Sequence, residues 1–138
     1  MTSAQDKSQA DGPLVLSIDA MGGDRGPAAI VAGLALFARK HRDVRILLRG
    51  PEADLRPMVD RHRGLAAQCD IRNATGVVSM QDKPSHVMRN GQDTSMWSTL
   101  DSVRNGEATV AVSCGNTGAL MLLSMVRLRK LPGVNRPA

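Results

Sequence analysis

The segment L-V-L-S-I-D-A-M-G-G-D-R-G-P, residues 14–27, runs from an apolar stretch into a loop rich in glycine. Its first six residues are mostly apolar and branched, which is typical of a short buried β-strand. The glycine pair at residues 22–23 ends this strand, and Pro27 suits the first turn of a helix, where proline's missing N–H is harmless. The segment therefore predicts a strand, a tight loop and a helix, the unit from which α/β folds are built.

The same alternation of strands and helices continues along the chain. Strands are expected at residues 14–19, 44–49, 69–73 and 108–113, the last of them buried. Helices are expected at residues 27–41, 51–63, 84–90, 95–105 and 119–130. Pro57 should bend the second helix or delay its start. Strands that alternate with helices predict a mostly parallel sheet. We expect residues 1–13 to form a disordered arm and residues 14–138 to form the folded part.

The composition is that of an ordinary globular protein. Apolar residues make up 42% of the 138 positions and charged residues 22%, which excludes wholesale disorder and fits one domain. One Phe, one Trp and no Tyr disfavour a nucleic-acid partner, since such modules stack bases on aromatic side chains. Cys69 and Cys114, without a C-x-x-C motif, indicate neither a disulfide framework nor a zinc site. With no signal peptide or membrane span in the sequence, we expect a cytoplasmic protein.

The net charge of +5 is concentrated near the end of the chain. Residues 102–138 hold five basic side chains, namely Arg104, Arg127, Arg129, Lys130 and Arg136, against Glu107 alone. Such a segment would attract an acidic partner, a phosphate group or an anionic membrane surface. A solvated basic face without a partner is the alternative interpretation.

Ligands of parallel α/β sheets bind beyond the carboxyl ends of the strands, and two loops are expected there. The first covers residues 19–26, where glycines let the backbone approach a ligand and the following helix start offers N–H groups to an anion. It matches neither the P-loop nor the dinucleotide-binding glycine motif. A tight structural turn, with Asp24 capping the helix, is the alternative.

The second loop, S-C-G-N-T-G-A at residues 113–119, is more polar. Ser113, Asn116 and Thr117 supply side-chain donors, and the N–H groups at the start of the next helix form an anion-binding nest. A phosphate or a developing oxyanion suits such a place. The alternative is an ordinary turn in which Asn116 or Thr117 is the N-cap.

The remaining polar residues give weaker signals. His41, His62 and His86 are scattered, and we interpret all three as surface or structural residues. Cys114 precedes a helix, but buried packing in the turn is favoured over a reactive thiolate. Arg89 and residues 93–96 could line the edge of the same cleft. A helix break capped by Asp93 or Thr94 explains them equally well.

Taken together, four motifs resemble the bacterial phosphate acyltransferases of phospholipid synthesis, the PlsX family. They are I-D-A-M-G-G-D-x-x-P at residues 18–27, S-M at 95–96, S-x-G-N-T-G-A at 113–119 and R-P-A at 136–138. The resemblance implies an α/β/α sandwich of the isocitrate/isopropylmalate dehydrogenase type that usually forms a homodimer. It also implies transfer of a fatty acyl group from acyl carrier protein to inorganic phosphate, giving acyl phosphate, without a metal or another cofactor. Peripheral contact with the membrane from the cytoplasmic side is expected.

The resemblance implies roles for residues of both loops and their neighbours. The catalytic candidates are Ser113, Asn116 and Thr117. The candidates for binding phosphate or substrate are Asp19, Gly22, Gly23, Asp24, Arg89, Ser95, Gly115 and Gly118. Among these, the glycines would offer backbone N–H groups, while Asp19 and Asp24 would organise their loop.

The chain departs from the family pattern in three respects. The basic cluster usual before the S-M pair is reduced to Arg89, Cys114 replaces a usual Ala, and family members are much longer. We therefore expect an amino-terminal piece of a larger domain. Two alternatives remain: a non-catalytic truncated fragment, or another phosphate-binding α/β enzyme, such as a phosphotransacetylase-like protein or an isocitrate-type dehydrogenase.

Overall fold

The computed structural model describes residues 12–135, so most of the expected arm and the R-P-A motif lie outside the described residues. Four strands alternate with six helices in this part of the chain. In order they are β1 (Val15–Asp19), α1 (Gly26–Lys40), β2 (Arg45–Gly50), α2 (Glu52–Asp60), α3 (Arg63–Gln68), β3 (Cys69–Asn73), α4 (Pro84–Asn90), α5 (Ser95–Arg104), β4 (Val110–Val112) and α6 (Thr117–Arg127).

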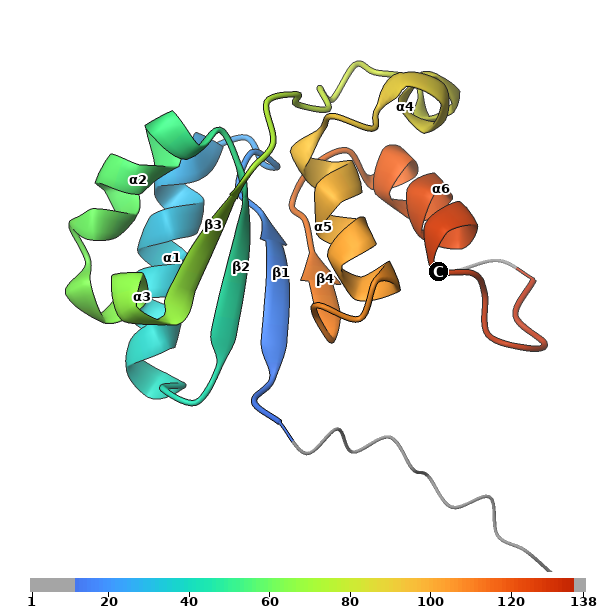
Figure 1. Ribbon diagram of the computed structural model, residues 1–138. Coiled ribbons are helices and arrows are strands. Elements are labelled where there is room, and N and C mark those ends of the chain that lie inside the picture. Colours follow the sequence, from blue (N-terminus) through green and yellow to red (C-terminus); the bar gives the residue numbers. More distant parts are fainter. Residues whose placement is uncertain (1–11, 136–138) are drawn as a thin grey trace, which may run out of the picture.

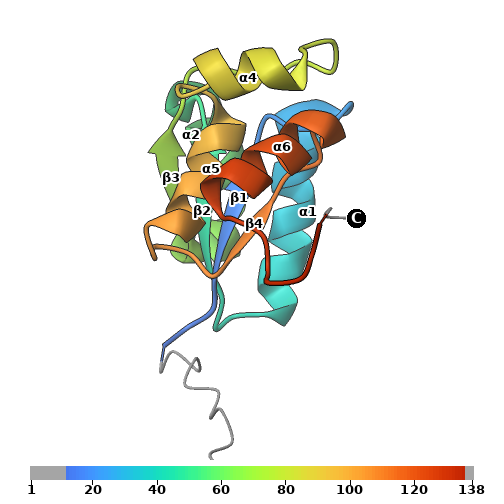
Figure 2. The ribbon, with the colours of Figure 1, turned by 90° about the vertical axis from the view of Figure 1, so that its right-hand side faces the viewer.

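The strands form one sheet in the order β3-β2-β1-β4, and every pair of neighbours is parallel. Helices α1, α2 and α3 lie on one side of the sheet and α4, α5 and α6 on the other (Figures 1 and 2). The expected α/β class with a parallel sheet is thus confirmed. Connections lie on both sides because the chain moves from β1 toward β3 in its first half and returns to the far side of β1 for β4.

Each face of the sheet has its own apolar core. Ile46 and Leu48 of β2 are fully buried and pack against the first three helices. Met96, Leu100 and Leu123 form the centre of a second cluster among the last three helices. Because successive residues of a strand point to opposite faces, Ile18 of β1 belongs to the first core while its neighbour Asp19 faces α5. The strand therefore delivers a carboxylate to the helix-α5 side at its carboxyl end.

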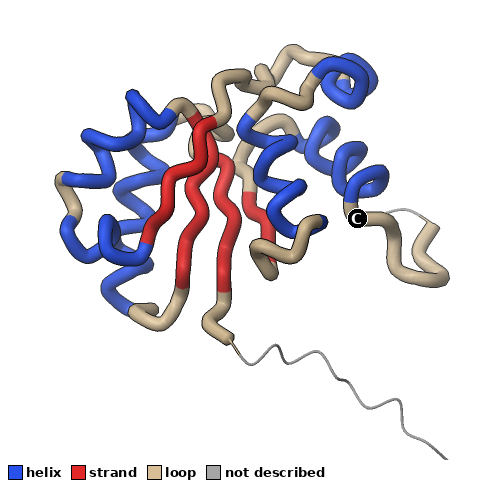
Figure 3. Tube along the Cα trace, viewed as in Figure 1, coloured by secondary structure: helices blue, strands red, loops and turns tan. Residues whose placement is uncertain are grey.

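The helix expected at residues 51–63 is α2, which ends at Asp60, and a further helix, α3, follows from Arg63 (Figure 3). Pro57 lies inside α2, which begins at Glu52 and continues past the proline to Asp60, so the expected delay of the helix start is not observed. Helix α3 was not predicted. It buries Leu65 against the core, and β3 follows it directly, with the bounds expected from the sequence.

The expectation of a buried strand at residues 108–113 is wrong in length and in burial. Strand β4 has three residues, and the side chains of Val110 and Val112 are 41% and 40% exposed. The reason is its position at the edge of the sheet, where it pairs with β1 alone. An apolar run predicts a strand, but it does not tell whether other elements cover that strand.

The last helix spans Thr117–Arg127 rather than residues 119–130. Arg129 has a φ of 67°, a left-handed conformation that ends the helix before Pro132. Arg129 and Lys130 therefore lie beyond the helix, and both are exposed. Across residues 12–135, no helix combines the length and the apolarity that a bilayer span requires.

Candidate functional site

The two glycine-rich loops meet where the connections of the sheet diverge. Strand β1 leads into α1 on one face, whereas its neighbour β4 leads into α6 on the other face (Figure 1). Such a switch point leaves a crevice at the carboxyl ends of the strands, and it is where ligands of open parallel sheets bind. The sequence placed both candidate loops at this edge, and the structure brings them into contact.

Glycine is required at residue 22 by this contact. A Cβ atom on Gly22 would lie 2.7 Å from the amide nitrogen of Gly115 and 2.8 Å from Oγ of Ser113, both too close for any side chain. A Cβ on Gly115 would in turn lie 3.4 Å from Cα of Gly22. The two loops therefore pack backbone against backbone at Gly22 and Gly115.

The buried carboxylate of Asp19 holds the loops together. Its Oδ1 accepts hydrogen bonds from Oγ of Ser95 at 2.6 Å and from the backbone N–H of Met21 at 3.0 Å. Its Oδ2 accepts from Oγ of Ser113 at 2.8 Å, and this hydroxyl accepts in turn from the N–H of Gly115 at 3.1 Å. Asp19 thereby ties the end of β1 to the start of α5 and to the loop after β4.

Asn116 is the N-cap of α6. It was one of the two residues expected from the sequence to cap this helix. Its Oδ1 accepts from the N–H of Ala119 at 3.1 Å, while its Nδ2 donates to the carbonyl oxygens of Ser79 at 3.1 Å and Asp82 at 2.9 Å. The buried amide is thus occupied by protein groups and serves to position the loop. Thr117, the first residue of α6, is exposed.

The first loop enters α1 through two left-handed glycines. Gly23 has a φ of 115° and Gly26 a φ of 74°, conformations that favour glycine. The prediction that Asp24 caps this helix is wrong, because Arg25 occupies the N-cap position and makes no side-chain hydrogen bond to the helix. Asp24 is instead exposed in the turn. The turn and the adjacent residues of α1 line a hollow of about 390 Å³.

Three further predicted residues differ in how the structure uses them. Arg89 is exposed on α4, and the structure does not bring its side chain to the Asp19 cluster. Gly118 lets α6 pack on α4, since a Cβ there would lie 3.1 Å from Cγ of Pro84. Cys114 is exposed, so the expectation of buried packing is wrong. The exposure has a simple reason: β4 ends at Val112, and Cys114 borders the open crevice beside α1.

Several interpretations of the flanking residues are confirmed. Thr94 caps α5, with its hydroxyl accepting from the N–H of Trp97 at 3.3 Å. His41 and His86 are exposed and His62 is half-buried, consistent with surface or structural roles.

The segment of residues 79–82 was missed by the sequence reasoning. Asn116 holds its backbone from one side, and Oδ2 of Asp82 accepts from the N–H of Ser79 at 2.8 Å. The spacing of Ser79 and Asp82 is a local turn signal that was available in the sequence. The contact with Asn116 was not available, since it spans 34 to 37 positions.

A half-buried arginine lies near this cluster but belongs to another network. Arg49 is opposite Asp19 in the register of β1 and β2. Its Nη2 donates to Oγ of Ser102 in α5 and lies 3.8 Å from the carboxylate of Glu107. Burial lowers the pKa of Arg49, an effect that Glu107 opposes. The guanidinium thus serves to hold α5 and the following turn on the sheet.

Parallel strands with two glycine loops in contact at a switch point define a ligand-binding α/β domain. The model of a family described as "Fatty acid synthesis protein" matches residues 14–138, and the chain belongs to this family. Similar proteins, each named phosphate acyltransferase, come from Paracoccus denitrificans, at 66% identity over 125 residues, and Rhodobacter capsulatus, at 68% over 126 residues. A third, from Roseobacter denitrificans, is 58% identical over 139 residues.

These alignments cover most of the present chain but only part of each relative. They include 91%, 91% and 100% of this chain and 34%, 31% and 39% of the Paracoccus, Rhodobacter and Roseobacter proteins, respectively. The chain thus spans about a third of the length of these relatives. What the relatives do as whole proteins therefore reaches this chain only as a proposal.

Proposed function

We propose that this chain supplies the phosphate-binding loops of an enzyme that transfers a fatty acyl group from acyl carrier protein to inorganic phosphate. The product, an acyl phosphate, would serve phospholipid synthesis. Family membership and the name of the relatives support this proposal. The observation that carries it is the direct contact of Gly22 with Gly115 beside the buried carboxylate of Asp19, because this contact brings the two glycine loops together at the carboxyl ends of β1 and β4.

In the proposed reaction, a phosphate oxygen forms a bond to the thioester carbonyl carbon and the carbon–sulfur bond breaks. Hydrogen phosphate and the acyl thioester become acyl phosphate and the free carrier thiol, with the phosphate's proton ending on the sulfur. The first N–H groups of α6 and the exposed Thr117 hydroxyl would bind phosphate or the oxyanion that develops on the carbonyl oxygen. Asp19, Ser113 and Asn116 would keep these donors in place before the reaction begins.

The proposal is tested first by binding. Titration of inorganic phosphate into the 138-residue chain, followed by calorimetry, should give a saturable site that is weakened in Thr117→Val. Ser85→Ala provides a matched control, because Ser85 is an exposed hydroxyl on another helix, α4. Equal phosphate affinity in both variants would remove Thr117 from the site.

Turnover is tested in a chimera. Residues 14–138 would replace the matching segment of the Paracoccus relative, with which the chain shares 66% identity. The chimera should release free thiol from acyl carrier protein thioester only when phosphate is present. Thiol release that continues unchanged without phosphate would contradict the acyl transfer to phosphate.

The same proposal includes partners and location. An acidic carrier protein would dock near Arg104, Arg129 and Lys130, which are all exposed. Arg127 is less available, because its guanidinium lies 2.6 Å from the carboxylate of Asp101 and 5.0 Å from the centre of the Trp97 ring. We further propose that the enzyme works in the cytoplasm as a homodimer, in peripheral contact with the membrane that receives its product.

A further inference from the structure

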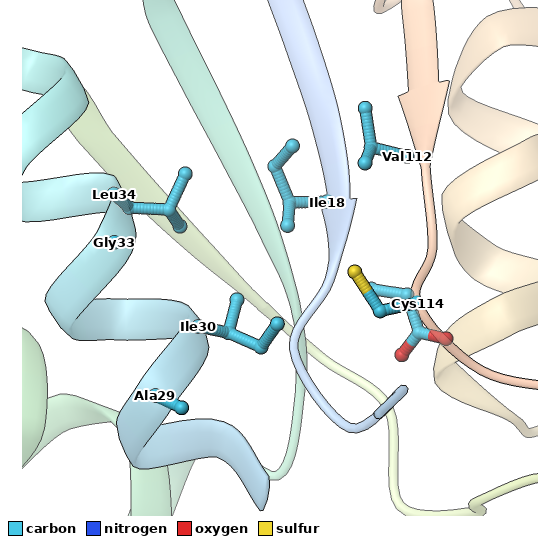
Figure 4. A pocket seen from close by; sticks show the side chains of 8 residues that line it. Ile18, Ala29, Ile30, Gly33, Leu34, Val112 and Cys114 are labelled. Carbon is cyan, nitrogen blue, oxygen red and sulfur yellow. The ribbon is translucent and has the colours of Figure 1, made fainter. Parts of the chain in front are cut away.

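An apolar groove lies between α1 and β4 on the side of the sheet that carries the first three helices. Asp19, Ala29 and Gly33 line part of it, and its volume is about 220 Å³. Its largest apolar lining residues are Ile18 of β1, Ile30 and Leu34 of α1, and Val112 of β4, and Cys114 completes the lining. The side chains of these residues point into one shared space (Figure 4). The groove exists because α1 packs over the β1 and β2 side of the sheet and leaves the edge strand β4 open.

This groove opens into the hollow at the first glycine loop. Ala29, Ile30 and Cys114 line both spaces, so the two are continuous. The hollow is lined by residues 22–26, where the start of α1 offers N–H groups to an anion, whereas the groove is almost entirely apolar. A ligand that occupied both would need an anionic head and an aliphatic chain.

From this continuity we propose that the groove between α1 and β4 is the subsite for the aliphatic chain of the acyl group. The inference rests on the proposed function and adds to it the path of the chain. The carbonyl end would lie at the glycine loops near Cys114, and the methylenes would run along Ile30 and Leu34 toward Val112.

The glycine at residue 33 supports this assignment. Gly33 lies within the 15-residue helix α1, where glycine disfavours the helix, yet a Cβ there would meet no atom within 4 Å. Neither backbone conformation nor packing within the chain therefore requires a glycine. The missing side chain has a visible consequence at the groove, which Gly33 lines and which any larger residue would narrow.

The test uses a series of alkylphosphonates from methyl- to dodecylphosphonate, which combine a phosphate-like head with a chain of chosen length. Calorimetry on the 138-residue protein, below the micelle concentration of each probe, measures their affinity. Burial of methylenes should raise the affinity by roughly two- to fourfold per added carbon until the groove is filled. Gly33→Leu should abolish this gain for the long chains and leave the affinity for methylphosphonate unchanged.

Two further variants keep the result interpretable. Gly64→Leu is the matched control, because Gly64 lies in α3 with open space around its Cα and outside the groove. It should preserve the full dependence on chain length. Val112→Thr changes the polarity of the groove with little change in volume and should reduce the gain per carbon. Thermal unfolding of each variant checks that the fold is retained.

Three outcomes would overturn the subsite. An affinity independent of chain length, with binding of the phosphonate head retained, would do so while leaving the proposed phosphate site intact. The subsite would also be overturned if Gly33→Leu and Gly64→Leu lost the gain in affinity with chain length equally. If sedimentation equilibrium finds a dimer that Gly33→Leu dissociates, a second copy of the chain occupies the groove instead. Failure of every probe, including phosphate, would contradict the proposed function as well.

Discussion

Asp19 and Ser113 are separated by 94 positions, yet the Ser113 hydroxyl donates a hydrogen bond of 2.8 Å to the Asp19 carboxylate. This bond joins the carboxyl ends of β1 and β4, the two strands whose following helices lie on opposite faces of the sheet. It therefore closes the floor of the crevice that we propose as the phosphate site. Its strength determines how well the two glycine loops hold their relative positions.

Removing this hydroxyl should weaken both stability and phosphate binding. Ser113→Ala leaves one oxygen of a buried carboxylate and the N–H of Gly115 without their partner, and we expect a loss of about 1–3 kcal/mol in unfolding free energy. Ser124→Ala is the control, since that hydroxyl bonds only to the Leu120 carbonyl within α6. Urea unfolding should show a larger loss of unfolding free energy in Ser113→Ala than in Ser124→Ala. Equal losses in the two variants would contradict a special role for the Ser113–Asp19 bond.

The hydrogen bonds donated by the Asn116 amide should contribute more to stability than the N-cap bond that its oxygen accepts. Asn116→Asp keeps the acceptor for Ala119 but replaces the donors to Ser79 and Asp82 by a carboxylate facing two carbonyls. We expect a loss of about 1–3 kcal/mol in this variant. Asn116→Ala removes the cap as well, for about 1 kcal/mol more. Hydrogen exchange at residues 79–82 should accelerate in both variants, and unchanged exchange there would refute the positioning role.

Gly22→Ala should be among the most damaging single-methyl changes in the chain. The new carbon would meet backbone of the other glycine loop at 2.7 Å, and the loops would have to separate. We expect destabilisation of about 1–3 kcal/mol by overpacking and loss of phosphate binding. Gly64→Ala, in the open part of α3, should instead be neutral or stabilising by up to about 1 kcal/mol. Calorimetric melting of both variants decides between a required contact and a merely permissive turn.

The two cysteines should differ sharply in reactivity. Cys114 is exposed at the crevice, whereas Cys69 is buried in the core and burial raises its pKa to about 11. A thiol reagent at pH 8 should therefore modify Cys114 rapidly and Cys69 only as the protein unfolds. Mass spectrometry of timed samples gives both rates. Bound octylphosphonate should protect Cys114, because that residue lines the groove.

Cys69 also predicts a pH dependence of stability. Its folded pKa lies above the unfolded value near 9, so its contribution is complete below pH 9 and declines as the pH rises through about 11. The decline from this thiol should be roughly 2–3 kcal/mol. Urea unfolding at pH 8 and pH 11 measures it, and Cys69→Ala should show a shallower decline. The same slope in both proteins would mean that other groups cause the loss at high pH.

Strands of the sheet could be predicted where apolar runs are enclosed on both faces. Strands β1 and β2 have such runs, and β3 was found at Cys69–Asn73 although only two of its residues are buried. Strand β4 was misjudged because burial depends on neighbours, and Val110 and Val112 have none beyond the sheet edge. The break between α2 and α3 was missed because proline is tolerated inside α2, and the helix ends only after Asp60.

For the site, proximity was predictable but individual roles were not. The carboxyl ends of adjacent parallel strands must meet, which placed residues 19–26 and 113–118 together. Whether Asn116 contacts a ligand or the protein depends on residues 79–82, a segment distant in sequence and without an apolar pattern. Arg89 is suggested by its position in a motif, and the structure shows it exposed on α4.

The strand order also has a consequence for synthesis on the ribosome. Strand β1 emerges first and pairs with β2 within about 30 positions, but its other edge waits for β4, because Asp19 and Ser113 are 94 positions apart. At about 5–20 residues per second, that edge stays unpaired for roughly 5–20 s. The half containing α1, α2 and α3 can therefore form before the site exists. Throughout this interval the nascent chain exposes one side of its central strand, where a chaperone or a second nascent chain could bind.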